Sequence, residues 1–405
     1  MATAKVPIDN TEATPPPKKK QRITNDDLYR KSTQFTLWSY THDELESAKR
    51  RANAHGQRKA KQNFDQAYQQ AKKDHPEVFT TADPDDDLLH PEKLQSILSF
   101  EEECTYLNFY SKNIIQTCNF FKMPTQVKLT AASFFKKFYL VNSVMEYHPK
   151  NILYTCVFLS AKSENYFISI ESFVKALKGT EASHILDLEF IVLQSLKFTL
   201  LVHHPMRPLY GFFLDFQAEL LHPSPLMYDV SVDTLGNLYN KAKEWLNEYA
   251  IISDVSFLFT PPQIALAAMY DCDKRITDRY LKRKFLKDDK LDVIKEETAE
   301  EETPTPVVKK EEENGDQKTE NGNPEEAVQE NEETKVSTHR EQYETLVRTI
   351  RKCIKIAKHI QTTSREESKE IDKKCFFALN PKKLIDKRIK KLTASSAPPE
   401  TKEQT

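Results

Sequence analysis

Glycine is scarce in this chain, and its scarcity excludes whole classes of protein. Only 6 of the 405 residues are glycine, and two of these, Gly315 and Gly322, lie in a polar segment that we expect to be disordered. A phosphate-binding loop needs several glycines close together, because the backbone must approach the phosphates closely. The sequence therefore argues against the usual nucleotide-binding enzymes.

Metal-binding and membrane-spanning patterns are also missing. The six cysteines form no CxxC pair and have no histidine at zinc-ligand spacing, so we expect reduced thiols, several on apolar helix faces. No run approaches the roughly 20 apolar residues of a membrane span, and the N-terminus lacks the apolar region of a secretory signal. We expect a protein of the cytosol or nucleus with no metal, cofactor or catalytic residue.

Helical periodicity dominates the part of the chain between about residues 100 and 285. The segment from Ile152 to Ala161 is apolar nearly all round, which is typical of a helix buried at the centre of a domain. It ends at Lys162, and Glu189 follows 27 positions later on a second amphipathic helix, expected at about 181–196. A buried helix that carries a lysine to a rim, with a glutamate nearby, fits a docking surface better than a catalytic pocket.

A second group of helices repeats this plan after residue 205. Thr260-Pro261-Pro262 is typical of a capped helix start, and the small-residue-rich helix behind it is the expected counterpart of 152–161. The predicted fold class is all-α, with two tandem five-helix domains and flanking N- and C-terminal helices.

The flanking segments differ sharply in composition. A polar helix is expected over 43–73, with Gly56 as a candidate kink, and a single final helix over about 365–392. The predicted organisation is a disordered basic tail over 1–27, an N-terminal segment over 28–93, a first domain over 94–202, a second over 203–361 with a disordered acidic insert at 288–338, a C-terminal helix over 362–392 and a tail over 393–405.

Two of these segments carry candidate regulatory residues. The basic cluster of the N-terminal tail is a candidate nuclear-import signal, with a merely solvated tail as the alternative; it comprises Lys18, Lys19, Lys20 and Arg22. In the acidic insert, Thr303 and Thr305 each precede a proline and suit a proline-directed kinase. The alternative is that the insert is a tolerated surface loop.

Several motifs together resemble the cyclin family, and within it the cyclin H group, in a fungal form that departs from the animal one by the acidic insert. The motifs lie at 28–30, 38–41, 134–140, 142–149, 159–165, 203–212 and 260–265. The resemblance covers about 28–392 without the insert. It implies that the two five-helix domains are cyclin boxes.

The resemblance also implies a function. Cyclins are non-catalytic subunits that bind and activate a cyclin-dependent kinase, and cyclin H serves the kinase of transcription factor IIH. The implied partners are the kinase catalytic subunit, a RING-finger assembly subunit and the transcription factor IIH core, in the nucleus. The implied substrates include the C-terminal repeat of RNA polymerase II.

The kinase-binding residues are assigned by their position in the family pattern. Lys162 and Glu189 match the cyclin pair that hydrogen-bonds to the kinase backbone beside its αC helix. Further candidates are Lys137, Glu164, Phe167 and Ile168. Ordinary surface charge is the alternative for Lys162 and Glu189, and solvent exposure is the alternative for Lys137 and its neighbour Lys136.

A cyclin-fold scaffold or nucleic-acid-binding protein, like the core of transcription factor IIB, is the rival interpretation. The basic stretches 279–287 and 382–391 favour it. The net charge of −2 and the missing zinc ribbon argue against it. We therefore expect no membrane partner and no direct nucleic-acid partner.

Overall fold

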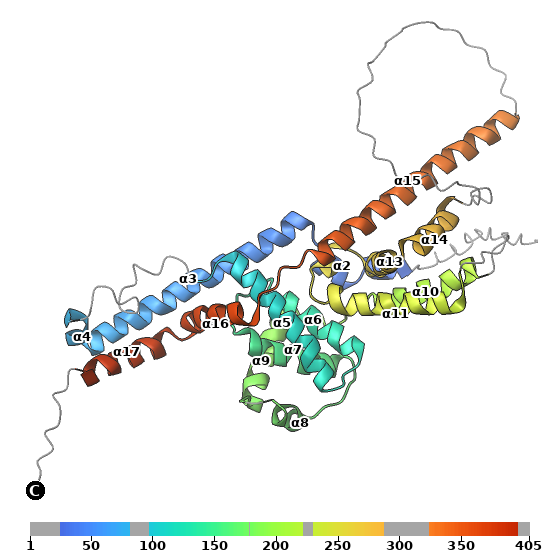
Figure 1. The fold of residues 1–405 in the computed structure, drawn as a ribbon. Helices are drawn as coiled ribbons and strands as arrows, with labels where there is room; N and C mark the ends of the chain where they lie inside the picture. Colours follow the sequence, from blue (N-terminus) through green and yellow to red (C-terminus); the bar gives the residue numbers. More distant parts are fainter. Residues whose placement is uncertain (1–24, 82–96, 178, 222–229, 287–323, 396–405) are drawn as a thin grey trace, which may run out of the picture.

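The computed structural model describes residues 25–81, 97–177, 179–221, 230–286 and 324–395, and within these ranges every regular element is a helix (Figure 1). This confirms the predicted all-α class. None of the described helices is both long enough and apolar enough to cross a bilayer.

The first box is built around a buried central helix. Its helices are α5 (Phe100–Phe120), α6 (Thr125–Phe138), α7 (Pro149–Ser163), α8 (Ile170–Lys175) and α9 (Ala182–Ser195). α7 begins with Pro149 in its first turn, where a missing N–H costs nothing, and the His148 ring accepts the Lys150 N–H at 3.2 Å. α5, α6 and α9 pack around α7, so its apolar surface is buried on nearly all sides, as the sequence predicts.

The second box repeats this arrangement around α13. Its elements are α10 (Met206–Leu220), α11 (Val232–Trp245), the π-helix η2 (Leu246–Ala250), α12 (Val255–Leu258), α13 (Pro261–Cys272), α14 (Lys274–Leu286) and α15 (Pro324–Lys358). Thr260 and Gln263 form a reciprocal capping box at the start of α13. α15 begins at Pro324, inside the range predicted for the acidic insert, while residues 287–323 lie outside the described residues.

Helices from both ends of the chain flank the first box. The N-terminal ones are α1 (Asn25–Arg30), α2 (Thr33–Trp38), α3 (His42–Asp74) and α4 (Pro76–Thr81), and the C-terminal ones are α16 (Arg365–Leu379) and α17 (Pro381–Ser395). α17 lies along α3 (Figure 1). The predicted single C-terminal helix is wrong, because the chain breaks at Asn380 and Pro381 starts a new helix.

The predicted kink at Gly56 is also wrong, since α3 runs unbroken through this residue. Gly56 instead allows α3 to approach Ser143 closely. A Cβ atom added there would lie 2.3 Å from the Cβ of Ser143, so only glycine lets α3 pack this closely against the segment before α7.

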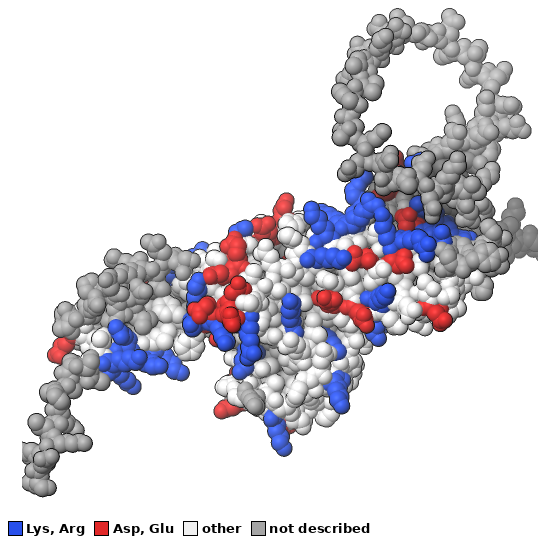
Figure 2. Space-filling model, viewed as in Figure 1, with Lys and Arg blue, Asp and Glu red and all other residues white. Residues whose placement is uncertain are grey.

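Charge is unevenly distributed over the face of the molecule that Figure 2 shows. Much of the first box is uncharged in this view, whereas Lys and Arg side chains gather over α14 and α15 (Figure 2). On α15, Arg348, Arg351, Lys352 and Lys355 are exposed and recur at helical spacing. They form one basic stripe along the helix.

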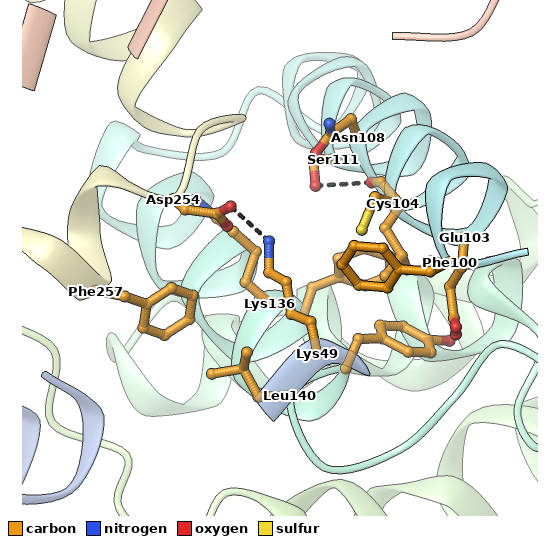
Figure 3. Close-up of a pocket in the computed structure, with 13 residues that line it drawn as sticks. Lys49, Phe100, Glu103, Cys104, Asn108, Ser111, Lys136, Leu140, Asp254 and Phe257 are labelled. Carbon is orange, nitrogen blue, oxygen red and sulfur yellow. Dashed lines mark hydrogen bonds and ion pairs between the residues drawn. The ribbon is translucent and has the colours of Figure 1, made fainter. Parts of the chain in front are cut away.

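Two lysines join α3 and the first box to the second box. Lys49 of α3 forms an ion pair with Asp254 at 2.5 Å, and Lys136 of α6 donates to the Ser253 carbonyl oxygen. Asp254 and Phe257 enter this junction from the second box, opposite residues of α5 (Figure 3). Burial alone would raise the pKa of Asp254, but Lys49 and Lys136 outweigh it and lower the pKa. The Asp254 carboxylate therefore stays charged and links the second box to α3 and α6.

Candidate functional site

The end of α7 presents Lys162 next to Glu189. The helix closes with Asn165 in the left-handed region (φ 56°), and the Tyr166 N–H donates to the Ala161 carbonyl oxygen at 2.8 Å. This fixes Lys162 in the last turn, where the helix dipole favours a cation. Its ammonium forms an ion pair with the carboxylate of Glu189 and lies 4.9 Å from the centroid of the Phe158 ring. The Lys162 side chain is 46% exposed and that of Glu189 18%.

Aromatic and aliphatic side chains surround this pair on the surface. Leu186, Glu189 and Phe190 share one face of α9, and both apolar residues are exposed. The exposed ring of Phe198 lies 6.1 Å from that of Phe190. Leu201 is also exposed, and the Ser163 hydroxyl donates to the adjacent Leu200 carbonyl oxygen at 3.5 Å, which places this segment beside the end of α7. We call Leu186, Phe190, Phe198 and Leu201 the apolar rim.

The backbone holds Phe198 in an uncommon conformation. Lys197 and Phe198 have φ of 52° and 55°, and the Phe198 N–H donates to the Leu193 carbonyl oxygen at 2.9 Å, which closes α9. Two consecutive left-handed residues that are not glycine are rare and costly. They turn a large apolar ring towards solvent, so this strain lies at the candidate site.

The pair and its rim have the composition of a protein-binding surface. Exposed apolar side chains grouped around a few oriented charges are typical of interfaces. Among the described residues no group of three or more His, Cys, Asp or Glu could hold a metal ion. The sequence reasoning missed the rim, although the spacing of Leu186 and Phe190 around Glu189 was a usable signal.

The other predicted contact residues are distributed differently. Phe167 is 94% exposed, whereas Ile168 packs partly buried against the core of the first box. Glu164 accepts a hydrogen bond from the Thr130 hydroxyl at 2.5 Å and lies 3.7 Å from the ring of His204. The neighbouring His204 ring is the main reason that the pKa of Glu164 is lowered. Glu164 thus binds the end of α7 to the segment between the boxes.

Lys137 lies inside the molecule. Its side chain is only 2% exposed, and its ammonium lies 5.3 Å from the centroid of the Trp38 ring. Burial lowers the pKa of both Lys136 and Lys137 to about 8. The alternative that these two lysines are solvated is therefore wrong, and Lys137 does not lie on the surface formed by Lys162, Glu189 and the rim.

The candidate regulatory residues cannot be placed. Lys18, Lys19, Lys20, Arg22, Thr303 and Thr305 all lie outside the described residues. The nuclear-import and phosphorylation predictions stay predictions.

Comparison with known proteins bears on both boxes. Residues 96–201 match the model of the cyclin N-terminal domain, and residues 204–358 match that of the cyclin C-terminal domain. The chain belongs to the cyclin family. The end of α7 and the face of α9 that carry Lys162 and Glu189 both lie in the cyclin N-terminal domain.

Individual relatives of this cyclin are cyclins of the H group. Cyclin CCL1 of Saccharomyces cerevisiae is 39% identical over 272 residues, which cover 66% of this chain and 64% of the yeast protein. Cyclin-H of Xenopus laevis is 38% identical over 193 residues, which cover 45% of this chain and 57% of the frog protein. The matched part thus spans less than two thirds of each relative. The predicted resemblance to cyclin H is confirmed.

A solved structure shares the fold. A chain of the CAK complex of Chaetomium thermophilum, determined with ATP-gamma-S, matches with a TM-score of 0.62 at 22% identity, covering 95% of this chain and 100% of that chain. At this identity the match supports the two-box fold alone.

Proposed function

We propose that this cyclin is the regulatory subunit of a cyclin-dependent kinase of transcription factor IIH. It binds and activates the kinase and contributes no catalytic group of its own, so that the kinase phosphorylates the C-terminal repeat of RNA polymerase II. The observation that carries the proposal is the Lys162–Glu189 pair, exposed within an apolar rim on the first box. The cyclin H relatives support the choice of kinase.

The geometry suits the activation of a kinase through its αC helix. An active kinase needs the αC glutamate held against the lysine of strand β3, and a rigid surface that holds αC inward can supply this without entering the active site. α7 gives such rigidity, because it is packed on nearly all sides. Lys162 offers hydrogen-bond donors and Glu189 an acceptor for the kinase backbone, while the rim supplies apolar contact area.

The wider assembly follows from the same family resemblance. We infer a RING-finger assembly subunit and the transcription factor IIH core as further partners, and the nucleus as the location. Phe167, fully available to solvent beside the end of α7, extends the proposed kinase contact, with Ile168 beneath it.

Reconstitution with the kinase tests the proposal. The chain is co-expressed with a transcription-factor-IIH-type kinase, and phosphorylation of a polymerase repeat peptide is measured for wild type and for Lys162→Ala/Glu189→Ala. The matched control is Lys373→Ala/Glu370→Ala, which removes another exposed ion pair (2.7 Å) on α16. We expect activity that depends on the chain, falls with the first variant and survives in the control. A chain that neither binds nor activates the kinase would contradict the proposal.

A nucleic-acid-binding function is the second candidate, favoured by the basic stripe on α15. Arg348, Lys352 and Lys355 are exposed, and none has an ion-pair partner among the described residues. Phosphate backbones bind such stripes. The formal net charge of −2 and the cyclin H relatives favour the kinase instead.

A further inference from the structure

A cavity lies between the two boxes, and none of its lining residues belongs to the proposed kinase surface, although Val202 on its wall directly follows Leu201 of the apolar rim. Its volume is about 40 Å³, which is room for about three water molecules or one small anion. Four parts of the chain line it: α2, the end of α6, the segment between the boxes, and the second box. The polar residues on its wall are Gln34, Ser133, Lys136, Lys137, His203, His204 and Ser256.

Two nitrogen atoms on this wall lack hydrogen-bond partners among the described residues. They are Nζ of Lys137 and Nε2 of His203, and both are buried. The Lys137 ammonium lies 5.3 Å from the centroid of the Trp38 ring. Lys136, by contrast, donates to the Ser253 carbonyl oxygen. The cavity therefore holds one buried ammonium with nothing to accept its hydrogen bonds.

The local structure fixes His203 firmly in this position. The Gln34 side chain accepts the His203 N–H at 2.7 Å and donates to the His203 carbonyl oxygen at 3.3 Å. The Tyr29 ring packs edge-on against the imidazole, with centroids 5.5 Å apart. Gln34 thus fixes the backbone of His203 and Tyr29 packs against its ring, so the imidazole loses less freedom when it binds a ligand.

The charged side chains that line the cavity are of one sign, and the nearby carboxylates of Asp254 and Glu164 interact with Lys136 and His204 and have no recorded contact with Lys137. No aspartate or glutamate is among the residues that line the cavity. A buried ammonium without a counter-charge is strongly unfavourable, and proteins resolve this by pairing the charge or by losing the proton. An anion that accepts hydrogen bonds would remove this cost here.

We propose that this cavity binds one small oxyanion, of the size of phosphate or a simple carboxylate, between the ammonium of Lys137 and the imidazole of His203. The Nε2–H tautomer of His203 donates the second hydrogen bond, and the hydroxyl groups of Ser133 and Ser256 are on the same wall. Because the wall comes from both boxes and from the N-terminal segment, a bound oxyanion stabilises their relative arrangement. The site shares no residue with the proposed kinase contact.

Thermal unfolding of the full-length chain, without kinase, tests this proposal. The unfolding midpoint is measured against inorganic phosphate, and separately against acetate, with ionic strength held constant by sodium chloride. We expect a rise of several degrees when the ligand reaches about a hundred times its Kd, and above the Kd the rise should be logarithmic in ligand concentration. Phosphate also stabilises proteins without binding to a site, but that effect grows in proportion to concentration.

Two variants of equal charge change separate the site from general effects. Lys137→Met removes the ammonium and keeps most of the side chain, and we expect the logarithmic rise to disappear. Lys175→Met removes an exposed lysine on α8 and should leave it unchanged. No logarithmic rise in wild type, or an equal rise in Lys137→Met, would overturn the proposal and leave a cavity that holds water only.

A direct binding measurement covers the case in which Lys137→Met does not fold. Equilibrium dialysis of the wild-type chain against labelled phosphate should give one phosphate per chain, displaced by excess acetate and lost in His203→Ala. Binding that does not saturate, or that persists unchanged in His203→Ala, would contradict the site. Neither result bears on kinase activation, so the two proposals fail separately.

Discussion

The central helices of the two boxes end in opposite ways. α7 carries Lys162 in its last turn, where it faces solvent beside Glu189 and the apolar rim. α13 ends at Asp271 and Cys272, and the Asp271 carboxylate, although as exposed as that of Glu189, already has two partners within the chain. It accepts the Trp245 indole N–H at 2.8 Å and forms an ion pair with Lys358 at 2.7 Å. One helix end is open to a partner, and the other is closed by the chain itself.

The difference arises from the last helix packed on each core. In the first box this helix is α9, which turns Glu189 and Phe190 outwards and then ends in a strained turn. In the second box it is α15, whose last residue, Lys358, reaches back to the end of α13. The same five-helix plan thus gives the proposed docking surface in one box and a helix end paired within the chain in the other. In this proposal the covering helix, and not the fold alone, determines which box binds the kinase.

The sealed end should contribute more to stability than the open one. Asp271→Ala leaves the Trp245 N–H without its acceptor and Lys358 without its counter-ion, so we expect the free energy of unfolding to fall by about 1–3 kcal/mol. Chemical denaturation measures this loss. Glu189→Ala is the comparison, and should cost less than about 1 kcal/mol because it removes one surface ion pair and leaves no indole N–H without an acceptor. Equal losses would remove the distinction between the two ends.

The apolar rim should matter for kinase binding and little for folding. Phe190→Ser and Phe198→Ser each remove an exposed ring, and we expect each to weaken kinase affinity by about 1–2 kcal/mol, or roughly 5- to 30-fold. Calorimetric titration with the kinase measures this change.

The second box offers the matched control for the rim. Leu214→Ser removes an exposed apolar side chain from α10, and affinity should stay unchanged. An equal loss from Leu214→Ser would place the kinase contact on both boxes.

The sequence was sufficient to predict that Lys162 and Glu189 lie together at the end of α7. Lys162 and Glu189 meet because α7 and α9 pack side by side, and both helices were visible from their apolar periodicity. The break at Pro381 was also predictable, since proline lacks the N–H that a continuous helix needs. These features depend on local chemistry or on regular spacing.

Features that depend on distant chain segments were not predictable. Lys137 resembles a solvated lysine in its own helix, but Trp38, about a hundred positions earlier, covers it. Gly56 resembles a helix breaker until Ser143 is found against it. The ion pair between Lys358 and Asp271 likewise depends on the packing of α15 against α13, which are far apart in the sequence.

The buried lysine should also respond to pH in a defined direction. Burial lowers the pKa of Lys137 to about 8, against about 10.4 in an unfolded chain. Between these values the unfolded chain binds more protons at this residue than the folded one, so its contribution to stability increases with pH. We expect the free energy of unfolding of wild type, minus that of Lys137→Met, to increase from pH 7 to pH 9.5. A difference that does not change with pH would contradict the burial of the ammonium.

The smallest effect is expected at the basic stripe of the second box. If α15 is an ordinary solvated surface, Arg348→Gln/Lys352→Gln/Lys355→Gln should leave kinase affinity unchanged, and wild type should show no duplex binding at physiological salt. A fluorescence titration with duplex DNA at two salt concentrations measures this. Binding that weakens steeply with salt and disappears in the variant would instead support the nucleic-acid function.

The central claim is that the open end of α7 is the kinase contact, and affinity for the kinase tests it most directly. The Kd of the transcription-factor-IIH-type kinase is measured for wild type, for Lys162→Ala/Glu189→Ala and for the control Lys373→Ala/Glu370→Ala. The account predicts a loss of about 2 kcal/mol or more, roughly 30-fold, for the first variant only. Unchanged affinity, with both variants folded as wild type, would contradict it.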